Sequence, residues 1–371
     1  MKYYIIAGEA SGDLHGSNLM KSLNQADTNA DFRIVGGDLM EAQGGVLLKH
    51  YRDMAFMGIV DVLLNIRTIG KNLRFCKSDI SNWKPDVVIL IDYAGFNLKI
   101  AEYCKNNGIK VFFYIAPKVW AWQESRVKKI KKYVDQLFVI FPFEVEYFRK
   151  HGIEAEYFGN PLNDEIALFQ KHKLDFQSFT SNNQLDKRPI IALLAGSRKH
   201  EIDRCLPEML TALEDMDKYQ LIVAGAPSIP QEKYSEIIGM KAVKVVYNQT
   251  YNLLSNATAA VVTSGTATLE TALFKVPEVV VFKTGPITYV IGKLIVHIKF
   301  FSLVNIIMGK EVVKELLQKN LARDIKIEIQ NILNKNEYRN QMVSDFNTIE
   351  EMLGKSGVSD RLANKMIELL K

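Results

Sequence analysis

The sequence has little cysteine and no arrangement typical of a disulfide framework or a zinc site. Its 371 residues contain three cysteines, Cys76, Cys104 and Cys205, which lie far apart and form no CxxC or Cys/His cluster. An odd number of dispersed cysteines argues against a disulfide-stapled fold and against a structural zinc site. We therefore expect a protein of a reducing, cytoplasmic compartment.

Long apolar runs are also missing. The first run, Tyr3–Ala7, has five residues and continues into Gly-Glu-Ala-Ser-Gly-Asp, whereas the apolar core of a secretory signal needs at least about seven. The stretch Ile287–Met308 is the most membrane-like, but two lysines and a histidine lie in its middle. Because a spanning helix requires about 20 predominantly apolar residues, we expect no transmembrane span.

Metal-binding and dinucleotide-binding motifs are absent from the sequence as well. The six histidines show no HExxH or paired spacing, and the first glycine turn has neither the GxGxxG spacing nor a Walker A lysine. Asp215-Met216-Asp217 matches a metal-binding D-x-D pattern, but it precedes the predicted strand Gln220–Ala224 and so lies away from the carboxyl ends of the strands. We interpret it as solvated helix-end charge and expect neither a metal ion nor a cofactor.

The composition is that of an ordinary globular protein. Hydrophobic residues make up 48% of the chain and charged residues 24%, which excludes a disordered or fibrous protein. The net charge of +5 is compatible with an anionic ligand or a membrane surface but is too small to indicate nucleic acid. The length suggests two domains, each able to bury a core.

Short apolar runs alternate with helix-length segments in both halves of the chain, a pattern typical of parallel sheets wrapped by helices. The predicted strands are Lys2–Ala7, Phe32–Val35, Val87–Ile91, Lys110–Ile115, Gln136–Ile140, Ala155–Phe158, Pro189–Ala195, Gln220–Ala224, Val243–Val246, Ala259–Val262 and Glu278–Phe282. The sequence thus predicts an α/β protein with two Rossmann-like, doubly wound domains that face a cleft, where the carboxyl ends of the strands bind ligands.

The polar stretch Leu174–Arg188 loses hydrophobic periodicity and is rich in Ser, Asn and Gln, as linkers are. We predict an N-terminal domain at residues 1–170, a C-terminal domain at 186–345 and a helical tail at 346–371. In the last helix Leu362, Met366 and Leu369 share one face. We expect this tail to pack back on the N-terminal domain or to be exchanged in a dimer.

Two turns that follow strands could hold anionic or sugar ligands. The first, Gly8–Asp13, combines glycines with a helix start and suits a sugar or an acceptor; a tight turn capped by Ser11 or Asp13 is the alternative. In the second half, Gly196-Ser197-Arg198 places an arginine beside a helix start, which suits a diphosphate.

A third turn, Ser264–Glu270, places hydroxyls and bare amides at another helix start, one turn before Glu270. Glu270 could accept hydrogen bonds from ribose hydroxyls; the alternative is a capping arrangement in which the acid complements the helix dipole. Asp92 ends a predicted strand, where a general base would face the cleft, and here the alternative is a helix cap.

Two surfaces bear on partners. Ser125–Lys132 has five basic residues, with Val127 and Ile130 at helical spacing, and predicts a helix with one buried stripe and a basic outer face. Ala55–Ile69 is apolar almost all round, which indicates a helix that is buried or lies in an interface or membrane. With the apolar, partly basic Ile287–Phe301 it suggests peripheral membrane contact, although a core helix explains each segment alone.

Taken together, the residues resemble the lipid-A-disaccharide synthases, which join two acylated glucosamines in building the lipid A anchor of the Gram-negative outer membrane. The resemblance covers nearly the whole chain and differs from the family pattern at Ala94, Gly95, Ala195 and Val304. It rests on GEASGDLHG (Gly8–Gly16), MGIVDVL (Met57–Leu63), KPDVVILIDYAGFN (Lys84–Asn97), PKVWAW (Pro117–Trp122) followed by Arg126, FPFE (Phe141–Glu144), GSR (Gly196–Arg198), SGTATLE (Ser264–Glu270) and SLVNIIMGKEVVKELLQ (Ser302–Gln318).

The resemblance implies a GT-B fold and a metal-independent, inverting transfer from UDP-2,3-diacylglucosamine to 2,3-diacylglucosamine 1-phosphate. It also implies a peripheral protein of the cytoplasmic face of the inner membrane and is compatible with a homodimer. Asp92 would take the proton of the acceptor 6-hydroxyl, with Glu9, Asp13 and His15 as alternative bases. The implied donor-binding residues are Gly196, Ser197, Arg198, Ser264, Gly265, Thr266, Glu270 and Asn305. The implied acceptor-binding residues are Gly8, Glu9, Ser11, Gly12, Asp13, His15 and Arg126.

Two rival functions fit part of the same pattern. Another UDP-sugar enzyme, such as a 2-epimerase or the glycosyltransferase acting on the peptidoglycan lipid precursor, would use the same Gly-Ser-Arg turn and Glu-bearing helix. The apolar helix argues against the epimerase, whose substrate has no acyl chains. A non-catalytic nucleotide-binding or membrane-scaffold protein would retain all its measurable activity after Asp92→Ala.

Overall fold

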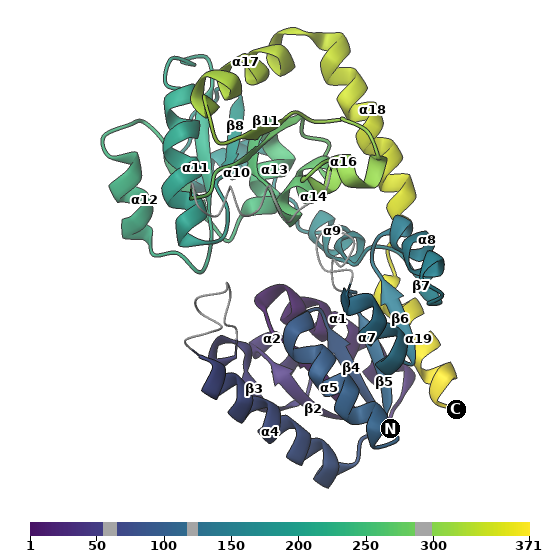
Figure 1. Cartoon of the computed structure of the whole chain (residues 1–371). Helices are drawn as coiled ribbons and strands as arrows, with labels where there is room; N and C mark the ends of the chain where they lie inside the picture. The colour runs from purple at the N-terminus through teal and green to yellow at the C-terminus, as the bar shows by residue number, and fades with distance from the viewer. Residues whose placement is uncertain (55–64, 117–124, 286–298) are drawn as a thin grey trace. The chain divides into compact units, whose positions relative to one another are not determined.

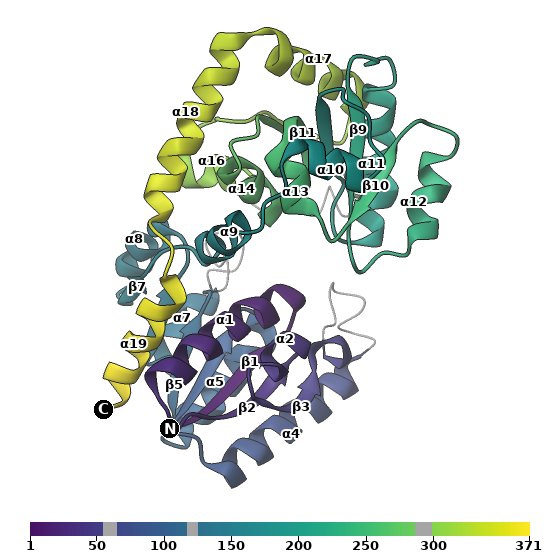
Figure 2. The same cartoon turned by 180° about the vertical axis from the view of Figure 1, so that it is seen from behind.

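The computed structural model describes residues 1–54, 65–116, 125–285 and 299–371. It divides into two compact units, one formed by Met1–Glu165 with Leu353–Lys371 and the other by Ile166–Met352 (Figure 1; Figure 2 shows the reverse side). The division falls within helix α9 (Leu162–Gln170). Within the described ranges, no helix has the length and hydropathy needed to cross a membrane.

The first unit is built on a parallel sheet whose seven strands, within the described residues, run in the order β3-β2-β1-β4-β5-β6-β7. Its centre is β1 beside β4, where Tyr3 pairs with Val87 and Ala7 with Ile91. Both strands are buried, β4 throughout, as expected for central parallel strands with continuous apolar sequences. The strands are β1 (Lys2–Ala7), β2 (Asp31–Gly36), β3 (Val46–His50), β4 (Val87–Ile91), β5 (Lys110–Tyr114), β6 (Gln136–Val139) and β7 (Ala155–Tyr157).

Alternate residues of these strands face two separate cores. Tyr4 and Leu90 belong to a core shared with α4, α5 and α7, whereas Tyr3 and Ile89 belong to one shared with α1 and α19. The helices of this unit are α1 (Ala10–Ala26), α2 (Asp38–Glu41), the 3₁₀ helix η1 (Tyr51–Asp53), α4 (Ile66–Trp83), α5 (Ala94–Asn106), α7 (Ser125–Tyr133), α8 (Pro142–Lys150) and the C-terminal α19 (Val358–Leu370). Helices therefore cover both faces of the sheet.

The C-terminal helix α19 packs against α1 within the first unit. Leu362 and Met366 are buried in the same core as Leu23 of α1. The carboxylate of Asp164 accepts hydrogen bonds from the amides of residues 357, 358 and 359 and so caps the start of α19. Ser22 of α1 donates to Asp360 at 2.6 Å. In this single chain the tail returns to the first unit; exchange in a dimer stays a prediction.

The second unit contains a second parallel sheet, with the order β10-β9-β8-β11-β12-β13 among the described residues. The strands are β8 (Ile190–Leu194), β9 (Gln220–Gly225), β10 (Lys244–Tyr247), β11 (Ala257–Thr263), β12 (Glu278–Phe282) and β13 (Glu315–Leu317). The helices are α10 (Phe176–Asn182), α11 (Lys199–Ala212), α12 (Gln231–Ile238), α13 (Thr250–Asn256), α14 (Thr266–Leu273), α16 (Leu303–Met308), α17 (Leu321–Asn334) and α18 (Asn336–Leu353). Both sheets place the third, second, first and fourth strands of their unit side by side, the order of doubly wound folds.

The predicted α/β class and parallel sheets are confirmed, with two differences in detail. The segment predicted to be a linker, Leu174–Arg188, instead contains α10, because Asp175 caps the helix and Phe179 anchors it in the core of the second unit. Strands β3 and β13 are not predicted from the sequence, since one is only half buried and the other has three residues.

Three predicted features lie wholly or partly outside the described residues. They are residues 55–64 of the apolar segment, the PKVWAW motif with neighbouring residues (117–124), and residues 286–298 of the second membrane-like stretch. The basic helix does lie in the described part of the chain. Its prediction is confirmed by α7, in which Val127 and Ile130 are buried while Lys128 and Lys129 are exposed.

Candidate active site

The glycines of the first turn are required by packing within the protein. A Cβ atom on Gly8 would stand 2.2 Å from the ring of Tyr93, and one on Gly12 would stand 3.1 Å from the Cβ of Ala7. A Cβ atom on the third glycine of the motif, Gly16, would stand 2.7 Å from the sulfur of Met40. These glycines let α1 approach the sheet and the ring of Tyr93 closely, which is a physical reason for the motif that involves no ligand.

Asp13 has a structural role in this arrangement. Its side chain is buried, and its carboxylate accepts hydrogen bonds from the amides of Gly37, Leu39 and Met40 at 2.7–3.1 Å. It therefore caps the start of α2, not of its own helix. The N-cap position of α1 is Glu9, whose side chain makes no capping hydrogen bond. The capping alternative for Ser11 or Asp13 is thus wrong for α1.

Two further polar residues predicted here, Ser11 and His15, differ in their exposure to solvent. Ser11 is exposed. His15 is largely buried, and its Nδ1 lies 3.2 Å from Oε1 of Glu165, an ion pair only when the imidazole is protonated. His15 therefore faces α9.

Asp92 lies in an unusual backbone turn at the carboxyl end of β4. Both Asp92 and Tyr93 have left-handed φ angles, 45° and 47°, and Ile115, just beyond β5, has 62°. Residues other than glycine rarely adopt these backbone angles, so the surrounding structure must hold the turn in this conformation. The buried amide of Asn97 does so by donating to the carbonyls of Ile91 and Asp92. The N-cap position of α5 is Tyr93, so the capping alternative for Asp92 is not supported.

Four polar side chains gather at this end of the first sheet. Burial lowers the pKa of the Arg126 guanidinium, and the negative charge of nearby Asp92 opposes that shift. Burial raises the pKa of Tyr93 to about 12, with a further contribution from the charge of Glu9. The hydroxyl of Tyr93 donates to the carbonyl of Met54 at 2.6 Å. Glu9, Asp92 and Arg126, predicted separately, are therefore electrostatic neighbours of one turn, whereas Tyr93 and Asn97 were missed.

In the second unit, the Gly196-Ser197-Arg198 turn is already capped by a carboxylate. Glu201 accepts from the amides of Ser197 and Arg198 at 3.0 and 3.2 Å, and its Oε1 lies 3.6 Å from the Arg198 guanidinium. Gly196 has a φ of 107° and lies beneath the same carboxylate. The two amides that the sequence offered to a diphosphate are thus used within the protein, while the half-exposed Arg198 side chain reaches the surface.

The Ser264–Glu270 turn lies at the carboxyl end of β11. Ser264 donates from Oγ to the carbonyl of Phe301 at 2.9 Å, whereas Gly265 and Thr266 are exposed at the start of α14. Glu270, one turn into α14, accepts a hydrogen bond from the hydroxyl of Tyr251 at 2.8 Å. Exposed helix-start residues with a carboxylate one turn further on can receive a phosphate and a diol.

Asn305 is a structural junction within the second unit. Its side chain is fully buried; its oxygen accepts from the amides of Val312 and Val313, and its nitrogen donates to the carbonyl of Val313 and to Glu315. Glu315 also accepts from Ser302, the N-cap residue of α16. The side-chain amide predicted to bind the donor is therefore used within the protein.

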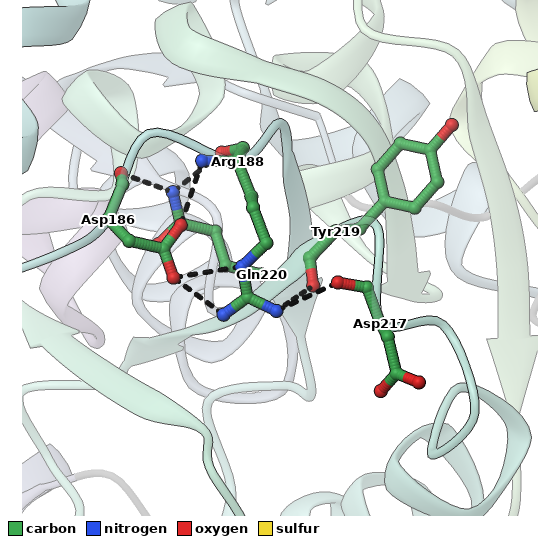
Figure 3. A network of polar contacts seen from close by, with 5 residues as sticks. All are labelled: Asp186, Arg188, Asp217, Tyr219 and Gln220. Carbon is green, nitrogen blue, oxygen red and sulfur yellow. Dashed lines mark hydrogen bonds and ion pairs between the residues drawn. The ribbon is translucent and has the colours of Figure 1, made fainter.

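The D-x-D pattern lies at the amino end of the second sheet, within a network of structural contacts (Figure 3). The carbonyl of Asp217 accepts from Arg188, which also pairs with Asp186, and Gln220 donates to the two carbonyls of Asp186 and Arg188. The other carboxylate, Asp215, pairs with Lys326. Among the described residues, no group of His, Cys, Asp and Glu is arranged to hold a metal ion.

The chain is similar to one protein family over almost its full length. The model of the family described as Lipid-A-disaccharide synthetase (LpxB) matches residues 3–366. Lipid-A-disaccharide synthases from Geobacter metallireducens and Myxococcus xanthus are each 35% identical to this chain, covering 99% of it and 96% and 97% of their own lengths. The corresponding protein of Coxiella burnetii is 34% identical, covering 99% of this chain and 98% of its own.

Solved structures with much lower identity share the fold. A UDP-GlcNAc 2-epimerase from Neisseria meningitidis, bound to UDP-GlcNAc, aligns with a TM-score of 0.70 at 12% identity over 99% of this chain and 100% of its own. The calicheamicin glycosyltransferase CalG4 aligns with a TM-score of 0.63 at 14% identity, over 99% and 98%. The fold is therefore the GT-B fold. Together with the full-length sequence matches, this places the chain in the lipid-A-disaccharide synthase family of glycosyltransferases.

Proposed function

We propose that this protein joins UDP-2,3-diacylglucosamine to 2,3-diacylglucosamine 1-phosphate, giving a tetraacyl disaccharide 1-phosphate and UDP. The acceptor 6-hydroxyl oxygen forms a bond to C1 of the donor sugar as the bond between C1 and the diphosphate breaks. The hydroxyl proton passes to a general base, and the electron pair leaves with UDP. The rival functions, an epimerase or a non-catalytic scaffold, are not favoured by the family match.

The observation that carries the proposal is the position of Asp92 at the carboxyl end of β4, with Arg126 as its electrostatic neighbour and Glu9 as that of the adjacent Tyr93. Asp92 is assigned the role of base because its strained turn holds it at the end of β4 and because it does not cap α5. The Arg126 guanidinium is an electrostatic neighbour of the Asp92 carboxylate. The same guanidinium suits the acceptor phosphate.

The second unit supplies donor binding in this proposal. Arg198 and the exposed start of α14 at Gly265 and Thr266 hold the diphosphate, and Glu270 accepts from the ribose hydroxyls. Charge that develops on the leaving UDP is stabilised by these donors instead of by a metal ion.

We further propose that the protein works at the cytoplasmic face of the inner membrane as a peripheral protein. Both of its proposed substrates carry acyl chains and partition into lipid. The exposed lysines of α7 form a basic face suited to anionic headgroups, with Lys128, Lys129, Lys131 and Lys132 on it.

Mass spectrometry of the reaction products tests the proposal. The purified chain is incubated with both acylated substrates in mixed micelles, with and without EDTA, and with UDP-GlcNAc alone in a parallel reaction. The expected result is a tetraacyl disaccharide 1-phosphate in equal yield with and without EDTA. Turnover of UDP-GlcNAc alone, without the disaccharide, would overturn the proposal in favour of an epimerase.

A further inference from the structure

A group of three aromatic rings lies beside the proposed donor site. Phe169 of α9, Tyr251 of α13 and Phe274, which follows α14, form all three pairwise contacts, with ring centroids 5.1–5.6 Å apart. Edge-on and tilted contacts of this kind restrict a ring from two sides. The position of the Tyr251 ring is therefore set by its neighbours, as is the direction in which its hydroxyl points.

That hydroxyl donates to Oε1 of Glu270 at 2.8 Å. Tyr251 lies in α13, which follows β10, and Glu270 lies in α14, which follows β11, so the bond joins two helices that each follow the carboxyl end of a strand. A pocket of about 280 Å³ lies beside Tyr251 and is lined by Phe169 and residues 248–252. The donor of the bond, Tyr251, is among the lining residues, whereas Glu270 is not.

We propose that Tyr251 is a positioning residue, which fixes the Glu270 carboxylate so that it accepts from the ribose hydroxyls of the donor nucleotide. The inference rests on the proposed donor site. A glutamate side chain has several rotatable bonds, and binding a diol costs the entropy of fixing them. The anchored hydroxyl fixes them before the ligand arrives. A hydrogen bond from a neutral donor to a carboxylate is strong enough to select one rotamer.

Calorimetry with two nucleotides tests the proposal. Tyr251→Phe keeps the ring in its aromatic group and removes only the hydroxyl. We expect UDP to bind about tenfold more weakly to this variant, and 2′,3′-dideoxy-UDP, which lacks the diol, to bind as it does to the parent chain. In a Glu270→Ala background the same substitution should change neither affinity, because the carboxylate through which Tyr251 acts is gone.

Tyr338→Phe is the matched control. Tyr338 also donates its hydroxyl to a glutamate of the second unit, Glu328, but this bond joins α17 and α18. Tyr338→Phe removes a comparable hydrogen bond, so this substitution should lower the melting temperature while leaving UDP affinity unchanged.

The outcomes separate the inference from the proposed function. Suppose first that the parent chain binds UDP more tightly than the dideoxy nucleotide. If Tyr251→Phe then weakens the binding of both nucleotides equally, or does not weaken UDP binding, the positioning role is overturned. Failure of the parent chain to prefer UDP over the dideoxy nucleotide would overturn the ribose role of Glu270 and the inference with it. If Tyr251→Phe lowers the affinity for UDP alone and Tyr338→Phe does not, the positioning role of Tyr251 and the ribose role of Glu270 are both supported.

Discussion

Both units carry candidate site residues beyond the carboxyl ends of the strands of a parallel sheet, but they hold these residues in different ways. In the first unit, Asp92 lies in a left-handed turn that Asn97 supports through the backbone, and its carboxylate has Arg126 as an electrostatic neighbour. In the second unit, Glu201 and Glu270 lie on regular helices, and each accepts from a defined donor. Backbone strain therefore holds Asp92 in the first unit, whereas regular helices hold Glu201 and Glu270 in the second.

This difference separates the two halves of a transfer reaction. A strained, charged turn suits a group that must exchange a proton, because the backbone fixes its direction. Helix-start amides and caps suit a ligand that is held without being protonated, such as a diphosphate. The comparison predicts that substitutions in the first unit change turnover, whereas those in the second change nucleotide affinity.

The largest effect is expected for Asp92→Asn. The amide keeps the size of the side chain but cannot accept the proton, so kcat should fall by about 10²–10⁴-fold. UDP affinity should stay within about twofold, since the nucleotide is assigned to the second unit. Turnover in mixed micelles and calorimetry with UDP measure the two quantities. Unchanged turnover would remove Asp92 as the base and leave Glu9 as the next candidate.

Arg198→Ala should have the opposite pattern. Loss of a charged donor to the diphosphate is expected to weaken UDP binding roughly tenfold. Arg188→Ala is the matched control, because Arg188 is an arginine of the same unit whose contacts lie at the amino end of the sheet (Figure 3). Equal UDP affinity of Arg198→Ala and the parent chain, measured by calorimetry, would exclude Arg198 from the site.

A buried acid gives the second unit a pH dependence of its own. Glu278 is fully buried, neither carboxylate oxygen has a hydrogen-bond partner among the described residues, and burial raises its pKa well above the ordinary 4.5. The folded state therefore binds a proton more tightly than the unfolded state, so the free energy of unfolding falls as the pH rises above about 4.5, by at most about 1.4 kcal/mol per pH unit.

Glu278→Gln should reduce this dependence, because the amide has no proton to lose. Urea unfolding near pH 5 and pH 8 compares the variant with the parent chain. The expected result is a smaller loss of stability between the two pH values in the variant. An identical loss in both proteins would show that Glu278 does not titrate in this range.

The smallest effect concerns a glycine that no contact requires. Gly70 lies inside α4, and a Cβ atom there would meet no atom of the described residues within 4 Å, in contrast to Gly8 beneath the Tyr93 ring. Gly70→Ala should therefore stabilise the first unit by about 0.5–1 kcal/mol through helix propensity. A lower melting temperature for this variant would contradict the account of α4.

Elements with a strong periodic signal were predicted from the sequence almost to the residue. β1, β4 and β12 match their predicted bounds because a continuous apolar run is a sufficient signal for a central parallel strand. The edge strand β3 and the short β13 lack that signal. α10 was missed because its core contact depends mainly on the single residue Phe179.

The candidate site was predicted less completely, since its residues depend on partners that are distant in sequence. Asp13 caps a helix that starts 25 residues later, at Asp38. The amide of Asn305 is used by β13 and the loop before it. Tyr251 and Glu270 meet only when folding brings α13 and α14 together. Residue type and spacing indicate which groups are suitable, whereas tertiary packing decides which are still available to a ligand.

The anomeric configuration of the product, determined by NMR, tests the central claim most directly. If Asp92 acts as a base in a single displacement, the new glycosidic bond must have the configuration opposite to that of the donor sugar. We predict this inversion. Retention of the donor configuration would exclude a direct back-side displacement by the acceptor and would contradict the role assigned to Asp92.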